Sequence, residues 1–461
     1  MLIENGIIRQ IIAKGEWRMA NEKSNSQIAI RKSQIAFIDA SGLLLFPHLI
    51  DCHVHFREPG YPQKATMKSE AASAKAGGIG TVCEMPNTDP PTVTIAALAD
   101  KVRRANEITD CDIRFFFGVT KSEHLIAARE LWMGTSDGLK RLRAHCCGVK
   151  IYFDHSTGDQ GVEIDLLDEV FRVCRELSIP LVGHCEDPAI NAEAKAKHAS
   201  SGKGPAELHS LIRPPESEAK AIAYALSLVR KHGTAFHVAH LSTKEGLELV
   251  RQAKADRLPV TCEVAPHHLF LSTYDDDNHS FLGTLAKMNP PLRTMDHRKA
   301  LWEGIADRTI DCIASDHAPH ALEEKNEGRP LDAPSGVPGV ETLLPLLLSV
   351  AHPHTALTRR PHPMYTDTDT CITHADILRL CFDNPNRIFR LGKQGIVEGA
   401  PADFILVDSN IEWTIRGKDL HAKCGWTPYE GWRVKGKVVR GFCPELRHFK
   451  QLGSGLTGRV C

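Results

Sequence analysis

Apolar and polar residues follow two different periodic patterns along this chain, and the pattern changes near residue 49. Residues 1–48 hold short runs in which apolar and polar side chains alternate, broken by polar stretches, and residues 391–461 return to the same pattern. Alternation with a period of two and no helical period is typical of strands with one buried face. We therefore expect one small β-sandwich domain built from both chain ends, residues 1–48 and 391–461.

Residues 49–390 follow the second pattern, in which apolar runs of strand length alternate with segments whose apolar residues recur at helical spacing. Residues 163–177, for example, space their apolar side chains three and four positions apart, and the apolar run that ends in His184 follows directly. Repeated strand–helix units of this size predict an α/β fold with a parallel sheet and helices outside. Roughly eight units fit a (β/α)8 TIM barrel. A doubly wound open sheet is the alternative.

The apolar run that opens this region, residues 49–60, carries the first candidate chemistry. It reads as a buried strand that ends in His53 and His55. Side chains two positions apart on a strand point to the same side, so both imidazoles can bind one metal ion. Arg57 follows in a Glu-Pro-Gly turn, where its guanidinium could clamp a carboxylate. A His-x-His pair alone is equally typical of structural histidines.

Later strand ends offer further polar groups. The residues at these ends are Lys150, His184, His240 and Asp316. Each has a plain structural alternative, such as a core histidine for His184 or a helix cap for Asp316. Together, four histidines and one aspartate at equivalent strand ends suit one or two divalent ions such as zinc. Their placement favours the barrel, because barrel enzymes keep their chemistry at this face.

Lys150 differs from the others because an ammonium group cannot bind a cation. A desolvated lysine has a lowered pKa, and its neutral amine can react with CO2 to give an anionic carbamate. Such a group could bridge two metal ions. An ion pair between Lys150 and a nearby carboxylate is the alternative, and the residues alone favour it.

Composition narrows the class of protein. The 56 lysines and arginines nearly balance 57 aspartates and glutamates, so no basic surface for nucleic acid or anionic lipid is expected. No apolar run is long enough to cross a bilayer, and the first residues lack the pattern of a secretory signal. The 14 cysteines form no repeated C-x-x-C framework, which is typical of reduced, buried thiols in a cytoplasmic protein.

Taken together, these motifs make the chain resemble the dihydroorotases of the amidohydrolase superfamily over nearly its whole length. The stretches that carry the resemblance are HFREPG, EMPNTDPPT, GVKIYF, GHCED, AHLSTKE, KMNPPLR, ASDHAPH and SGVPGVET. The resemblance implies a zinc-dependent enzyme that reversibly cyclises N-carbamoyl-L-aspartate to L-dihydroorotate in de novo pyrimidine biosynthesis.

The resemblance also implies two zinc ions, held at the positions of His53, His55 and Asp316 and of His184 and His240. A hydroxide and a carboxylated Lys150 would bridge them, as in the lysine-bridged, class I-like members. Some bacterial dihydroorotases use a loop aspartate instead, so Asp154 is the alternative bridge. Asp316 would also be the catalytic residue, moving a proton from the hydroxide to the departing ring nitrogen.

Substrate contacts follow from the same resemblance. Arg57, Asn87 and His320 match positions that bind the ring carboxylate. Asn289 and the backbone of Pro338 and Gly339 match positions that bind the ureide edge. Asn87 is equally typical of a turn residue, and we expect the polar segment 320–339 to be irregular and either a lid over the site or a passive loop.

Two other functions stay open. An allantoinase or hydantoinase would keep the metal residues but would not need a carboxylate clamp, so Arg57 and Asn87 argue against it. A non-catalytic homologue that assembles with aspartate transcarbamoylase would be expected to lose metal ligands, and the sequence keeps every expected one. A homodimer is the expected assembly, with transcarbamoylase association as a possibility.

Overall fold

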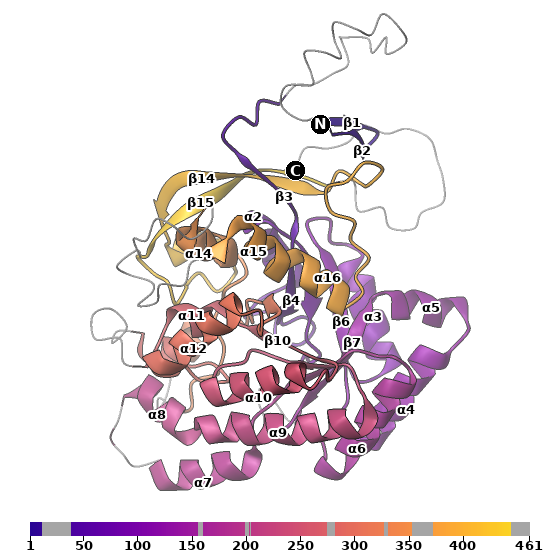
Figure 1. Ribbon diagram of the computed structural model, residues 1–461, viewed down its shortest axis with the longest axis vertical. Coiled ribbons are helices and arrows are strands. Elements are labelled where there is room, and N and C mark those ends of the chain that lie inside the picture. Colours follow the sequence, from indigo (N-terminus) through magenta and orange to yellow (C-terminus); the bar gives the residue numbers. More distant parts are fainter. Residues whose placement is uncertain are drawn as a thin grey trace, which may run out of the picture. The chain divides into compact units, whose positions relative to one another are not determined.

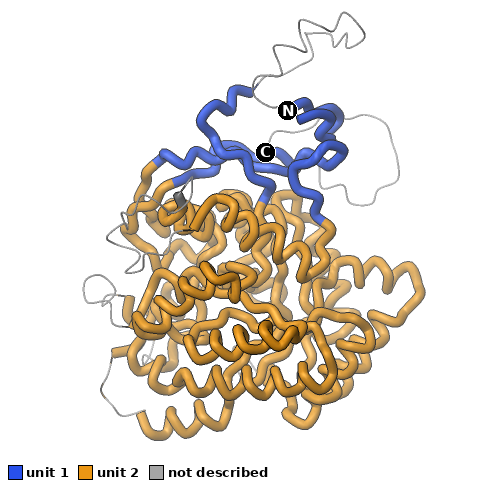
Figure 2. Tube along the Cα trace, in the orientation of Figure 1, with its two compact units in different colours: residues 1–48, 393–411, 436–461 blue, residues 49–392, 412–435 orange. Residues whose placement is uncertain are grey.

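The computed structural model describes residues 1–11, 38–154, 160–198, 202, 204–273, 282–326, 331–352 and 372–443 (Figure 1). The chain divides into two compact units, coloured separately in Figure 2. The first comprises residues 1–48, 393–411 and 436–461, and the second comprises residues 49–392 and 412–435. Residues 412–435 thus cluster with the central part of the chain.

The second unit is built around eight parallel strands. They are β4 Leu49–Val54, β5 Ile79–Glu84, β6 Asp112–Gly118, β7 Cys146–Tyr152, β8 Leu181–His184, β9 Phe236–Val238, β10 Val260–Val264 and β11 Cys312–Ile313. The strands pair in sequence order from β4 to β11. A parallel bridge between Val54 and His317, just after β11, joins the last strand region to the first. This arrangement confirms the predicted (β/α)8 barrel and excludes the open sheet.

Helices follow the strands and lie outside them (Figure 1). The longer ones are α2 Met67–Ala76, α3 Ile95–Ala105, α4 Ser122–Met133, α5 Asp137–Ala144, α6 Leu167–Glu176, α7 Pro188–His198, α8 Pro205–Ile212, α9 Pro215–His232, α10 Lys244–Ala255, α12 Met295–Ala306 and α14 Leu343–Val350. Short helices are α11 Pro266–Phe270, α13 Leu322–Asn326, α15 His374–Leu378 and α16 Asn384–Ile388. Within the described ranges, no helix is long and apolar enough to cross a membrane.

The strands are short and buried on both sides, as a parallel barrel requires. Every residue of β4 is buried, and so is every residue of β8. Thr66 and Ser69 form a reciprocal capping box at the start of α2, which fixes where the chain turns from the loop after β4 into the helix. The buried strands and the defined helix start together place the strand ends at one face of the barrel.

The first unit contains a hairpin and an antiparallel sheet. Strands β1 Leu2–Glu4 and β2 Ile7–Gln10 pair around the Asn5-Gly6 turn. Strand β14 Phe404–Thr414 lies between β3 Leu44–Pro47 and β15 Arg433–Phe442. Ile8 packs against Ala402 and Phe404. The small β-domain from both chain ends is therefore present, while residues 12–37, part of the amino-terminal region expected to form strands, lie outside the described residues.

Candidate metal centre and pocket

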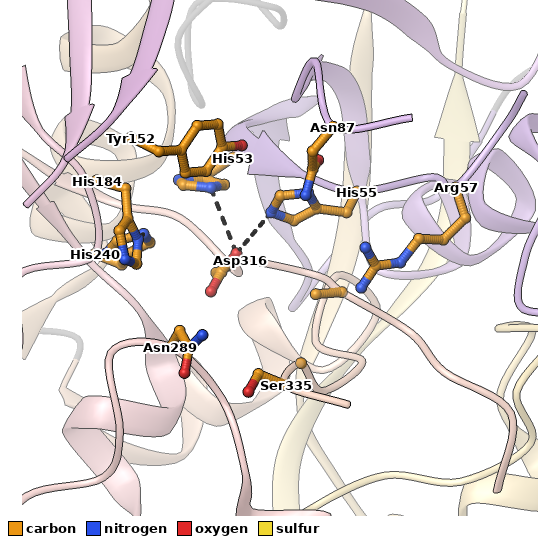
Figure 3. A pocket seen from close by; sticks show the side chains of 12 residues that line it. His53, His55, Arg57, Asn87, Tyr152, His184, His240, Asn289, Asp316 and Ser335 are labelled. Carbon is orange, nitrogen blue, oxygen red and sulfur yellow. Dashed lines mark hydrogen bonds and ion pairs between the residues drawn. The ribbon is translucent and has the colours of Figure 1, made fainter. Parts of the chain in front are cut away.

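His53, His55 and Asp316 form the first part of a buried polar cluster. His53 lies in β4, His55 directly follows it, and Asp316 lies three residues after β11. The Oδ1 atom of Asp316 lies 3.4 Å from His53 Nε2 and 3.1 Å from His55 Nε2 (Figure 3). One ligand atom from each residue lies within 4.8 Å of the other two. Three such donors at the end of parallel strands can hold one divalent ion.

His184 and His240 form the second part. His184 ends β8, and His240 lies two residues after β9. His184 Nδ1 lies 2.9 Å from His240 Nε2, and the ring centroid of His240 is 5.1 Å from that of His53. All four histidines and Asp316 therefore line one pocket. The structure brings together five of the six predicted metal ligands around that pocket.

In three of the four imidazoles, the ring nitrogen that faces away from the centre of the cluster contacts a neighbouring side chain. Glu263 binds His53 Nδ1, and the Asn87 side-chain oxygen lies 2.7 Å from His55 Nδ1. Glu186 lies 2.9 Å from His184 Nε2. Such contacts fix the tautomer and aim the remaining nitrogen at a common point, as in metal sites of proteins.

Burial favours the neutral form of His55, His184 and His240, the form that a metal ligand requires. It lowers the pKa of His55 to about 4 and also lowers the pKa of His184. Burial acts to raise the pKa of Asp316, but the neighbouring His53 and His55 outweigh it and hold this pKa well below its usual range. Near neutral pH, the cluster thus presents the Asp316 carboxylate beside the neutral imidazoles of His55, His184 and His240.

Lys150, the sixth predicted ligand, lies in β7 and is fully buried. Its Nζ has no hydrogen-bond partner among the described residues. Burial lowers its pKa to about 8, against the opposing effect of Glu263 and Asp316. A buried amine that lacks a partner beside two carboxylates is costly to keep. Within the part of the chain that the structure describes, Lys150 forms no ion pair of the kind that the residues alone favoured.

Asp154, the alternative bridge, is engaged elsewhere. Its carboxylate accepts a hydrogen bond of 2.7 Å from the Asn191 amide and lies 3.3 Å from Arg213. Arg213 in turn holds the Glu186 carboxylate through two nitrogens. Asp154 therefore belongs to the polar network behind His184.

Arg57 lies at the other end of the pocket from His184 and His240 (Figure 3), whereas His320, which was predicted to bind the same carboxylate, contacts Arg57 but does not line the pocket. Arg57 is buried, and its Nε donates a 3.0 Å hydrogen bond to the Pro319 carbonyl. The guanidinium NH2 lies 3.0 Å from His320 Nε2. Lys64 Nζ lies 3.0 Å from His320 Nδ1, and the Ser335 carbonyl lies 3.0 Å from His320 Nε2. Arg57 gives this end of the pocket a cation suited to binding an anion.

The remaining predicted contacts divide into two groups. Asn87 and Asn289 line the pocket, together with Tyr152, Ser335 and Gly336. Because the Asn87 oxygen faces His55, its NH2 group remains available for a ligand. Asn87 is therefore more than a turn residue.

Pro338 and Gly339 do not line the pocket. The Gly339 amide donates to His317 Nδ1 at 3.0 Å, and His317 Nε2 is held by Glu70 at 2.7 Å. The part of segment 320–339 that reaches the pocket is Ser335 and Gly336. The segment also contains helix α13, so it is less irregular than expected, and residues 327–330 lie outside the described part.

Three site residues have a left-handed backbone although none is glycine. The φ angles are 65° for Arg57, 33° for His240 and 46° for Asp316. Backbone of this kind is costly for a residue with a Cβ and gathers at functional sites. The hydrogen bond from the His240 amide to Glu263 supports one of these conformations.

Sequence reasoning did not single out Glu263, Glu186, Tyr152 or Ser335. Two of them had a usable signal: Glu186 follows His184 at a spacing of two, and Tyr152 follows Lys150 in the same way. Glu263 lies on β10 and binds His53, His237 and the His240 amide, a set of contacts that depends on the closed barrel. No local pattern marks Ser335.

Comparisons with known proteins agree with this geometry. The model of the amidohydrolase family matches residues 44–456. A dihydroorotase of Halobacterium salinarum is 38% identical over 397 residues, covering 86% of this chain and 84% of its own. A dihydroorotase of Staphylococcus epidermidis strain ATCC 35984 is 34% identical and covers 94% of both chains.

Solved structures with the same fold include the L-hydantoinase (dihydropyrimidinase) from Arthrobacter aurescens. It has a TM-score of 0.79 and 25% identity, covering 93% of this chain and 90% of its own. The D-hydantoinase (dihydropyrimidinase) from Thermus sp. has a TM-score of 0.75 and 24% identity, covering 91% and 88%. The chain therefore belongs to the amidohydrolase family and, within it, to the dihydroorotases.

Proposed function

We propose that this protein is a zinc-dependent dihydroorotase that interconverts N-carbamoyl-L-aspartate and L-dihydroorotate. The observation that carries the proposal is one pocket lined both by the His/Asp cluster and by the buried Arg57. The first group suits metal-assisted hydrolysis of an amide, and the second suits a substrate that carries a carboxylate beside that amide.

The residues present fit two zinc ions. His53, His55 and Asp316 would hold one, and His184 and His240 would hold the other. Lys150 would bridge them as a carbamate, because its amine is buried without a partner and its pKa is lowered. When bound, the ions would lower the pKa of a shared water and polarise the amide carbonyl.

The chain's own groups account for binding and proton transfer. Arg57 would bind the ring carboxylate, since its hydrogen bond to Pro319 fixes the guanidinium plane. Asn87 would donate to the same carboxylate, and Asn289 would contact the ureide edge. Asp316 would take the proton of the attacking water and give it to the departing ring nitrogen, because its low pKa keeps it ionised.

Hydantoin hydrolysis is the second candidate, favoured by the shared fold of the hydantoinases. That likeness concerns the scaffold and the metal face, which both activities use. A hydantoin ring carries no required carboxylate, so it would leave Arg57 buried without an anionic partner. The pocket therefore favours dihydroorotate.

A side-by-side assay tests the proposal. Zinc-loaded protein is given dihydroorotate, hydantoin and allantoin at equal concentrations, and ring opening is followed for each. We expect dihydroorotate to be preferred and Arg57→Lys to raise KM for dihydroorotate by roughly tenfold or more, because a bidentate contact is lost. Equal or faster opening of hydantoin or allantoin would refute the assignment.

A further inference from the structure

We propose that Lys325 is a positioning residue that fixes how two neighbouring segments of the pocket lining, residues 287–289 and 331–336, lie against each other. The inference deepens the proposed function and rests on it, because it concerns how dihydroorotate is held. Lys325 lies in α13, outside the pocket lining, so its effect would pass through the backbone that it binds.

The Lys325 ammonium is buried among carbonyl groups. The residue has no exposed surface, and its Nζ donates to the carbonyls of Lys287 at 2.9 Å, Pro334 at 2.9 Å and Gly336 at 3.1 Å. The face of the Trp426 ring lies beneath it, with 5.7 Å from Nζ to the ring centroid. Among the described residues, no carboxylate forms an ion pair with it.

Burying the Lys325 ammonium group in this environment costs free energy. An ammonium group removed from water without an acid loses most of its hydration energy. Three carbonyl oxygens match its three N–H donors, so the group is satisfied only in this one arrangement. A methionine or leucine would fill the same volume without that cost. The lysine therefore does more than fill space.

The three carbonyls belong to two neighbouring segments, and each segment contributes residues to the pocket lining. One segment contains Lys287 and leads to Asn289, which lines the pocket. The other is the 331–336 loop, whose Ser335 and Gly336 also line it. Lys325 thus joins the segment that carries Asn289 to the loop that carries Ser335 and Gly336.

Further hydrogen bonds between Lys287 and the 331–336 loop fix the distance between these two segments. The Gly336 amide donates to the Lys287 carbonyl at 2.9 Å. Lys287 Nζ donates to the carbonyls of Leu331 and Ala333, at 2.6 Å each. Gly336 is so close to Ala318 that an added Cβ would lie 2.5 Å from the Ala318 carbonyl oxygen. A small displacement of the loop would therefore change the pocket directly.

The test compares Lys325→Met with Lys299→Met in the zinc-loaded, full-length protein. Lys299 lies in α12 with an exposed side chain, which makes it a matched control. We expect Lys325→Met to raise KM for dihydroorotate by about tenfold or more, with kcat within about threefold of the control, since a segment of the pocket lining is displaced and the ligand set is untouched. General loss of folding would instead lower the active fraction and leave KM unchanged.

Hydrogen exchange of peptides covering residues 331–336 gives a second readout that needs no substrate. We expect faster exchange there in Lys325→Met than in the control, with unchanged exchange in β4 and β8. A KM within twofold of the control, or unchanged exchange at 331–336, would overturn the inference. If the wild type does not open dihydroorotate, the proposed function fails, and the exchange result alone decides the positioning role.

Loss of folding in Lys325→Met would be detected by circular dichroism. In that case Lys287→Met, which removes the bonds to Leu331 and Ala333, is measured in the same two ways. It should shift KM and the exchange of residues 331–336 in the same direction, and no shift in either would overturn the inference.

Discussion

The two nitrogens of each imidazole make different contacts in the His/Asp cluster. In His53, His55 and His184, one nitrogen is held by a neighbouring side chain and the other faces the cluster. A ring held in this way loses little rotational freedom when it binds a metal, which favours binding. Glu186 is the clearest holder, because Arg213 and His184 keep its pKa well below the usual range even though burial acts to raise it.

Replacing Glu186 by Gln is therefore expected to weaken zinc binding. The amide can still accept from His184, but the negative charge that strengthens the ligand is lost, and of the acidic partners that the structure describes Arg213 keeps only Asp154. Affinity should fall by about 10- to 100-fold, the usual effect of removing such a group. Competition with a chromophoric chelator measures this. Glu303→Gln, exposed on α12, is the control, and equal affinity of the two variants would contradict the role.

At the scale of elements, helix α8 is docked onto the segment that carries Asn289. Its His209 donates from Nε2 to the Met288 carbonyl at 3.0 Å and to the Asn289 side-chain oxygen at 2.9 Å. Burial, Arg213 and Lys287 lower the pKa of His209 to about 3. Its Nδ1 is buried and has no hydrogen-bond partner among the described residues, so a proton there would be unsatisfied.

This histidine makes the docking of α8 sensitive to acid. The unfolded chain binds a proton at His209 below about pH 6.5, whereas the folded chain does so only near pH 3. Stability is thus fully present above pH 6.5 and is lost as pH falls toward 3. Urea unfolding of His209→Gln, which keeps a donor but cannot titrate, should show a weaker decline between pH 7.5 and 5 than the wild type. Parallel declines would contradict this.

At the scale of the whole molecule, the proposed metal ligands lie in or just after strands β4, β7, β8, β9 and β11 of the barrel. Ions bound to such a set stabilise the folded chain relative to the unfolded one, by RT ln(1 + [L]/Kd). Removing zinc with a chelator should lower Tm, and adding zinc back should restore it. The gain at 100 times Kd is about 2.7 kcal/mol. A Tm that does not respond to zinc in a protein shown to bind it would contradict the shared site.

The sequence predicted the barrel and the positions of the ligands because both follow from local rules. Alternating strand and helix periods define the fold, and polar residues at strand ends must meet at one face. The left-handed backbone of Arg57 and Asp316 has no such local signature. Nor do the contacts of Glu263 and Lys325, whose partners lie on segments that only the closed barrel brings together.

His55 and Asp316 meet although 261 residues separate them in the sequence. Translation proceeds from the amino terminus, so a growing polypeptide still attached to the ribosome displays the early histidines long before the aspartate emerges. An incomplete product can offer only a partial set of donors, with correspondingly poor affinity. A chain that ends before Asp316 would lack this carboxylate, so the proposed metal site would be complete only after the last barrel strand has been synthesised.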